Sequence, residues 1–227
     1  MTQRPLTLLI TAGPTREPID PVRFLSNYST GVLGHLLVGE ARRRGHRVVF
    51  VTGPTGCLPP RGARTIAVET ALQMQAVLER EFPAVDGVIM AAAVADFRPA
   101  RASARKIKRS GVAGGLKLWR LELVENPDLI AGLAVRRTRQ VIVGFALETT
   151  RALANARAKL RDKQLDAIVL TQMDGQRAPF GETTVDGVIM QTGGATRPFR
   201  RLAKPALARR ILDTVEKLVK ALGRKGR

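Results

Sequence analysis

A loop rich in small and polar residues, residues 11–34 (TAGPTREPIDPVRFLSNYSTGVLG), joins an apolar run to a helical pattern. Ser29, Gly31 and Gly34 stand where that helix begins, and free backbone N–H groups and the positive end of the helix dipole favour a phosphate there. The spacing is neither G-x-G-x-x-G nor a Walker A loop. The segment therefore indicates either a phosphate site or an ordinary helix start.

Two polar side chains precede this helix start. Asn27 can hydrogen-bond an acyl oxygen of a substrate, or it can cap the helix or a turn. Arg23, four residues earlier, can pair with a phosphate or carboxylate, or it can be a structural surface arginine. Both are candidate substrate-binding residues.

A run of small residues follows a later apolar segment, at residues 90–96 (MAAAVAD). Met90, Ala91 and Ala92 leave room for a flat base against the backbone, although alanine runs are commonly core packing. Phe145, at the end of another apolar run, can stack on a base or belong to the core.

Four lysines and a predicted helix start are further candidate site residues. Lys106 and Lys108 lie on a basic stretch and can offset triphosphate charge as pyrophosphate leaves, or they can be solvated loop residues. Lys159 and Lys163 are four apart and share one helical face. In residues 126–128, Asn126 is predicted to be an N-cap, Pro127 the first helical residue and Asp128 a first-turn acid, and capping alone explains all three.

Apolar runs alternate with helical patterns along the chain, which predicts a parallel sheet covered on both faces. Strands are expected at residues 6–11, 47–52, 87–92, 140–145 and 167–170, and helices at residues 31–44, 72–81, 127–134 and 151–163. The fold class expected is α/β, a doubly wound, mostly parallel, Rossmann-like three-layer sheet. Right-handed crossovers then place the loops that follow the strands along one edge, where such sheets bind ligands.

Some stretches interrupt the alternation. A basic flap is expected at about residues 98–115, and it leads into a small strand insertion at residues 116–123. A second loop at residues 176–184 precedes an edge strand at residues 186–191, and a C-terminal helix is expected at about residues 203–222. Residues 1–227 are expected to form a single domain.

Composition narrows the function classes. The chain has 227 residues and a net charge of +19, which keeps a nucleic-acid-binding protein open, but the basic residues are scattered and only one Tyr and one Trp are available for base stacking. Cys57 is the only cysteine, and both histidines, His35 and His46, are expected at the surface. No apolar run reaches about 18 residues and the amino end shows no signal pattern, so a cytoplasmic protein is expected.

Several ordered motifs make this chain resemble the phosphopantothenoylcysteine synthetase family. They are residues 11–34, MAAAVADFRP at 90–99, KIKR at 106–109, ENPDLI at 125–130, VGFALET at 143–149 and KLRDKQLDAIV at 159–169. The resemblance implies a CTP-dependent ligase that joins 4'-phosphopantothenate to cysteine through an acyl-cytidylate. It also implies Mg²⁺ bound with the CTP co-substrate, a homodimer whose copies close each other's sites, and a separate flavin-dependent decarboxylase acting downstream.

The resemblance assigns roles residue by residue. Asn27 and Lys106 are the implied catalytic residues, and Arg23 and Asn27 the implied substrate-binding residues. The implied nucleotide-binding residues are Ser29, Gly31, Met90, Ala91, Ala92, Asp96, Lys106, Asn126, Pro127, Asp128, Leu129, Phe145, Lys159 and Lys163. No protein ligand for a metal is implied.

The chain departs from the family pattern in three places. Val32 replaces a lysine near the phosphates, Gln172 stands in place of an asparagine, and the loop at residues 179–184 is reduced. Two rivals remain: a nicotinamide- or flavin-dependent reductase, which the missing G-x-G-x-x-G disfavours, and a basic nucleic-acid-binding protein.

Overall fold

A computed structural model describes residues 4–108, 119–172 and 183–225. In those residues eight strands form one sheet in the order β12-β11-β10-β9-β6-β1-β4-β5. The bounds are β1 Thr7–Ala12, β4 Arg47–Thr52, β5 Arg64–Ala67, β6 Gly87–Met90, β9 Val141–Glu148, β10 Ala167–Gln172, β11 Thr184–Gln191 and β12 Thr196–Ala203. All neighbours from β10 to β5 pair in parallel, and β11 and β12 pair antiparallel. The doubly wound, mostly parallel sheet is confirmed.

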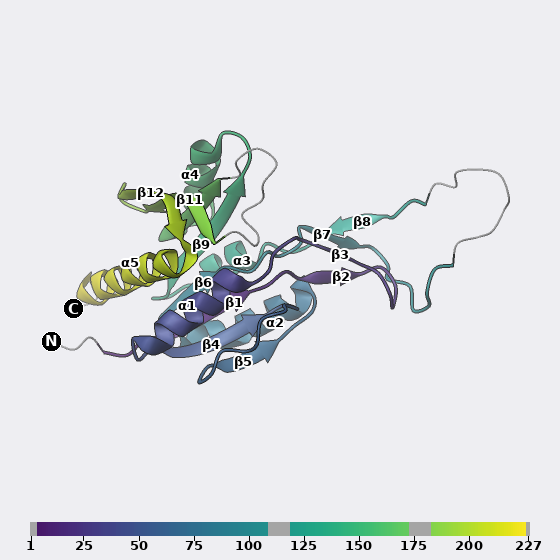
Figure 1. The fold of residues 1–227 in the computed structure, drawn as a ribbon, viewed down its shortest axis with the longest axis horizontal. Helices are drawn as coiled ribbons and strands as arrows, with labels where there is room; N and C mark the ends of the chain where they lie inside the picture. The colour runs from purple at the N-terminus through teal and green to yellow at the C-terminus, as the bar shows by residue number, and fades with distance from the viewer. Residues whose placement is uncertain (1–3, 109–118, 173–182, 226–227) are drawn as a thin grey trace.

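Helices cover both faces of the sheet, so the molecule has three layers (Figure 1). On one face α1 (Val32–Arg43) packs beside α5 (Lys204–Lys225). On the other lie α2 (Ala71–Glu81), the short 3₁₀ turn η1 (Phe82–Ala84), α3 (Leu129–Val135) and α4 (Ala152–Asp162). The central strands are mostly apolar because both of their faces are covered.

Two hairpins form an extension that reaches away from the sheet (Figure 1). One pairs β2 (Arg16–Pro18) with β3 (Phe24–Ser26), and the other pairs β7 (Phe97–Pro99) with β8 (Leu123–Glu125). Strands β2 and β7 lie against each other. We call these hairpins and the described residues that join their strands, 16–26, 97–108 and 119–125, the extension.

Several sequence expectations about these elements were wrong. The strand expected at 116–123 is found as β8, Leu123–Glu125, although residues 116–118 lie outside the described residues. The strand expected at the edge of the sheet, residues 186–191, is part of β11. It lies inside the sheet because β12 pairs with its outer side. Short strands β2, β3, β5 and β7 were not foreseen, since three or four residues carry too little periodicity.

His46 is not a surface histidine: it is 3% exposed. Its Nδ1 accepts a hydrogen bond from the Leu6 amide at 3.2 Å, and its Nε2 lies 2.9 Å from Glu216 Oε1. Arg44, two residues earlier in the chain, donates hydrogen bonds to Glu40 and Asp213. These contacts fasten α5 to α1, a tertiary pairing that the local sequence does not reveal.

Candidate active site

A cleft of about 840 Å³ opens at the carboxyl ends of β1 and β6. The chain runs from β1 outward through β4 to β5, and β6 then returns to the other side of β1. The connections therefore diverge between β1 and β6, and this divergence leaves a crevice, which is where open α/β sheets bind ligands. Its walls come from residues 27–34, 90–97, 125–130 and 145–147, with further side chains from α4, α5 and the ends of β10 and β11.

The phosphate-site candidate lies at the start of α1. Gly31 is the N-cap, has φ 76° and makes no side-chain cap, so backbone N–H groups are left facing the cleft. A side chain at Gly31 would place its Cβ 2.5 Å from Thr55 Cγ2, so the left-handed backbone and the close packing both require glycine. Ser29 Oγ lies 3.4 Å from the Gly31 amide and also lines the cleft.

Asn27 is exposed at the mouth of the cleft and is not a helix cap. Its Nδ2 donates to the carbonyl oxygens of Ala93 and Val94, both at 3.1 Å. Because both N–H donors are used within the protein, Oδ1 is the atom that it can offer to a ligand. That oxygen suits an N–H group better than an acyl oxygen, which corrects the contact expected from the sequence.

Lys159 of α4 and Lys163, the C-cap residue of that helix, line another wall. Lys159 Nζ donates to the Phe145 carbonyl at 2.8 Å, and Lys163 Nζ lies 2.7 Å from Asp128 Oδ2. Burial, and then the positive charge of Lys163, lower the pKa of Lys159. Burial alone raises the pKa of Asp128, but the hydrogen bonds from Lys163 and from the Ala131 amide hold it below its ordinary value. The pair of ammonium groups makes this wall suited to phosphates.

The N-cap expected at Asn126 was wrong, because α3 begins at Leu129 and Asp128 caps it by accepting from the Ala131 amide at 3.1 Å. Pro127 accordingly lies before the helix. Asn126 instead donates from Nδ2 to the Ala95 carbonyl at 2.8 Å, and its Oδ1 accepts from Arg98 at 3.1 Å. It ties the loop after β6 to the loop before α3, a role set by tertiary contacts.

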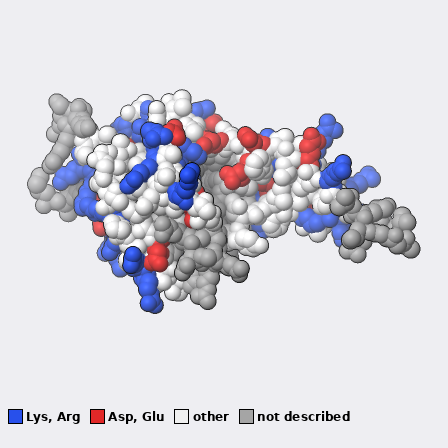
Figure 2. All heavy atoms as spheres, turned by 90° about the horizontal axis from the view of Figure 1, so that it is seen from above, with Lys and Arg blue, Asp and Glu red and all other residues white. Residues whose placement is uncertain are grey.

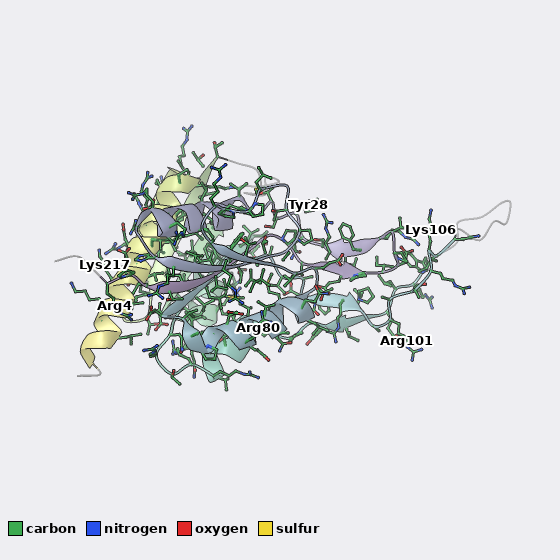
Figure 3. All side chains as sticks on the ribbon, turned by 90° about the horizontal axis from the view of Figure 1, so that it is seen from below. Arg4, Tyr28, Arg80, Arg101, Lys106 and Lys217 are labelled. Carbon is green, nitrogen blue, oxygen red and sulfur yellow. The ribbon has the colours of Figure 1, made fainter. Side chains whose placement is uncertain are left out.

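The cleft brings together all the nucleotide-binding candidates except Lys106, and it includes Asn27. Phe145 packs against the core and also lines the cleft, so its stacking on a base stays a prediction. Arg23 and Lys106 do not line it. Arg23 bonds Asp20 and the Ile107 carbonyl within the extension, and Lys106 lies towards the far end of the extension (Figure 3).

The cleft contains a lysine from the C-terminal region that the sequence did not predict. Lys204, the first residue of α5, is 8% exposed and lines the cleft beside Thr171 and Val185. No local pattern distinguishes it from the other basic residues of the C-terminal region, since only the docking of α5 brings it to the cleft.

Charge and membrane features complete the description. Lysine and arginine side chains are scattered over the face in Figure 2 with acidic residues among them. No helix in the described residues is long and apolar enough to cross a membrane. The same residues contain no cluster of three or more His, Cys, Asp and Glu suited to a metal ion.

Comparisons with known proteins place this geometry in context. The family model described as "DNA/pantothenate metabolism flavoprotein C-terminal domain" matches residues 4–219. The chain is 39% identical over 219 residues to the "Coenzyme A biosynthesis bifunctional protein CoaBC" of Mycobacterium tuberculosis (strain H37Rv), covering 92% of this chain and 51% of that protein. It is 36% identical over 212 residues to the protein of the same name from Escherichia coli (strain K12), again covering 92% and 51%.

A solved structure is also similar. It is the crystal structure of the C-terminal domain of a Coenzyme A biosynthesis bifunctional protein CoaBC, with a TM-score of 0.82 and 32% identity over 97% of this chain and 100% of that one. The chain spans about half the length of the curated relatives that it matches, 51% in both cases.

Proposed function

Because the chain belongs to the DNA/pantothenate metabolism flavoprotein C-terminal domain family, we propose that it is a phosphopantothenate–cysteine ligase of coenzyme A biosynthesis. The substrates are 4'-phosphopantothenate, cysteine and CTP. The observation that carries the proposal is the cleft at the divergence between β1 and β6, where a helix start, small-residue backbone and two lysines meet. A reductase on this sheet would instead require a dinucleotide-binding glycine loop, which the chain lacks.

The reaction has two steps. The carboxylate of phosphopantothenate attacks the α-phosphorus of CTP, the bond to the bridging oxygen breaks, and pyrophosphate leaves. The amine of cysteine then attacks the acyl carbon and loses a proton, and CMP leaves with the bonding electrons. Both steps depend on positioning and charge neutralisation more than on a strong base, which suits a cleft with lysines, backbone amides and no lining histidine among the described residues.

The cleft offers groups for each part of the nucleotide. The backbone at Met90 to Ala92 reads cytosine, Phe145 and Asp96 contact the nucleoside, and residues 126–129 close over it. Gly31 and Ser29 at the start of α1, together with Lys159 and Lys163, bind the phosphates. Mg²⁺ would accompany CTP and would offset part of the phosphate charge, held mainly by phosphates and water.

Asn27 acts in the second step. Its Oδ1 is positioned to accept an N–H from the amine of cysteine, and its Nδ2 fixes the side chain on the loop after β6. The bonds to Ala93 and Val94 also hold residues 27–30 against the wall that reads the base.

The enzyme acts as a homodimer in which the extension of each copy completes the other's cleft. Arg23 and Lys106 do not line the cleft of their own chain. The extension exposes many large apolar side chains, a pattern typical of an interface. These side chains are Val22, Phe24, Phe97, Trp119, Leu123 and Val124. In the dimer, Arg23 pairs with substrate and Lys106 neutralises the triphosphate.

The dimer has its own test. Val124→Glu places a charge on the exposed apolar face of β8 and should yield a monomer by size-exclusion chromatography with light scattering. The monomer should bind CTP but release pyrophosphate at least about a hundredfold more slowly, as expected for a missing electrostatic group. A monomeric variant with full activity would show that one chain is sufficient.

The overall reaction is tested by pyrophosphate release with phosphopantothenate, CTP and Mg²⁺. We expect release without cysteine to stop near one equivalent per site and to become catalytic when cysteine is added, with phosphopantothenoylcysteine detected by mass spectrometry. The product keeps the carboxyl group of cysteine, and a flavin-dependent decarboxylase activity consumes it. CTP-independent DNA binding without pyrophosphate release would favour the nucleic-acid alternative.

A further inference from the structure

A buried carboxylate lies in the turn between β2 and β3. Asp20 is 4% exposed, and its two oxygens serve different partners. Oδ1 accepts from the Val22 and Arg23 amides, both at 2.9 Å, which forms the turn itself. Oδ2 accepts from the Arg23 guanidinium and, at 3.1 Å, from the amide of Ile107.

The second set of contacts holds the backbone of Ile107 from both sides. Its N–H donates to Asp20 Oδ2, and its carbonyl accepts from Arg23 Nη2 at 2.9 Å. We call these bonds the Ile107 clamp. The hydrogen bond from Arg23 holds the pKa of Asp20 well below its usual range against the effect of burial, so the clamp keeps its charge at neutral pH.

The clamp is anchored further along the same segment. The Ser103 amide donates to the Ile19 carbonyl at 2.9 Å, so the chain between Ser103 and Ile107 is tied to the β2–β3 turn at two points. Arg23 also lies over the Trp119 ring, 5.0 Å from its centroid. Lys106 is the residue immediately before the clamped position, and it is itself exposed.

We propose that Asp20 is a positioning residue for pyrophosphate release, because it fixes the backbone from which Lys106 projects. The inference rests on the proposed function and assigns a new role to a residue outside the cleft. An exposed loop lysine must lose backbone freedom before it can stabilise a leaving group, and this loss of conformational entropy opposes the step. The Ile107 clamp removes that freedom before substrate binds, and small displacements of such a group reduce rates strongly.

Asp20→Asn separates the hydrogen bonds that form the turn from those that hold Ile107. An amide oxygen in the place of Oδ1 still accepts from the Val22 and Arg23 amides, so the turn survives. An NH₂ group in the place of Oδ2 accepts nothing, so the contacts to Ile107 and to the Arg23 guanidinium are lost. Glu17→Gln is the matched control, because Glu17 is a buried carboxylate in β2 that accepts from the Ala71 amide at 2.9 Å and makes no contact with Ile107.

Two measurements test the proposal on the whole 227-residue chain. In hydrogen exchange, Asp20→Asn should speed exchange of the Ile107 amide at least about tenfold and Glu17→Gln should not. A double-mutant cycle is run at saturating phosphopantothenate, so that altered pairing of Arg23 with substrate does not limit the rate. Under that condition Asp20→Asn should slow pyrophosphate release at least about tenfold in the parent protein but less than about twofold in Lys106→Gln, because its remaining effect passes through Lys106.

Each unfavourable result has a distinct meaning. Equal slowing in both backgrounds would reduce Asp20 to a structural residue and overturn the proposal, as would unchanged exchange at Ile107. A parent protein that releases no pyrophosphate would contradict the proposed function instead, and the exchange measurement would still decide whether Asp20 holds Ile107.

Discussion

Helix α1 contains two glycines, Gly34 in close contact with the sheet and Gly39 in open space, and each can be replaced by alanine. An added Cβ at Gly34 would lie 2.3 Å from Ala12 Cβ and 3.0 Å from the Thr11 carbonyl oxygen, both on β1. An added Cβ at Gly39 would meet nothing within 4 Å. Gly34→Ala and Gly39→Ala therefore differ only in what the new methyl group contacts.

The expected free energies follow from these distances. Alanine is favoured over glycine inside a helix by about 0.8–1.0 kcal/mol, and this gain is common to both variants. Gly39→Ala should therefore raise the free energy of unfolding by about this amount. At Gly34 a carbon–carbon approach far below the usual 3.5–4.0 Å forces α1 away from β1, and overpacking costs roughly 1–3 kcal/mol. The two variants should therefore differ by about 1–3 kcal/mol in free energy of unfolding, with Gly34→Ala the less stable.

The displacement also reaches the cleft. Gly34 is one turn from Gly31, and residues 31–34 line the cleft where the phosphates are proposed to bind. A shift of α1 moves those backbone N–H groups, so CTP affinity should fall at least about tenfold in Gly34→Ala, or about 1.4 kcal/mol. Gly39→Ala should bind CTP as the parent does.

Urea unfolding and isothermal titration with CTP make both comparisons. Equal stability of the two variants would refute the packing argument. A destabilised Gly34→Ala that binds CTP normally would refute the placement of the phosphates at the start of α1.

Three further predictions follow from the site and the core. CTP should be preferred over ATP by at least about tenfold in pyrophosphate release, and equal use of ATP would contradict base reading by the backbone at Met90 to Ala92. Asn27→Asp places a carboxylate against the carbonyl oxygens of Ala93 and Val94, which repel it. The variant should bind CTP but form little product, and mass spectrometry should detect accumulated acyl-cytidylate. Near-normal product formation would show that Asn27 is only a turn residue. Hydrogen bonds from Arg43 and Arg44 lower the pKa of Glu40 from 4.5 to about 2, so the stabilisation by its carboxylate is present above pH 4.5 and is lost as the pH falls towards 2. In urea unfolding, the difference in free energy of unfolding between the parent and Glu40→Gln, about 1 kcal/mol, should narrow over that pH range. A difference that stays constant with pH would show that ionisation of Glu40 does not contribute to stability.

Local sequence was sufficient for the parallel centre of the sheet, β4, β1, β6, β9 and β10, but not for its edge strands β5 and β12. Buried parallel strands such as β1 and β6 read as continuous apolar runs, and the alternation with helices requires parallel pairing. The carboxyl ends of neighbouring parallel strands share one edge, which predicts a site in the loops after β1 and β6. That residues 159–163 belong to the same site was implied by the family resemblance and not by periodicity. Which hydrogen bond each side chain makes there did not follow, as Asn27 and Asn126 show.

The residues whose surroundings come from distant segments needed the tertiary structure. His46 is buried only because α5 docks on α1, and Lys204 enters the cleft by the same docking. Arg23 and Lys106 carry the right chemistry in their motifs, yet the hairpins place them on the extension, away from their own cleft. Residue type and periodicity determine which groups are available and which elements form. The position of a side chain relative to another segment depends on long-range packing, which is not encoded in any short stretch of the chain.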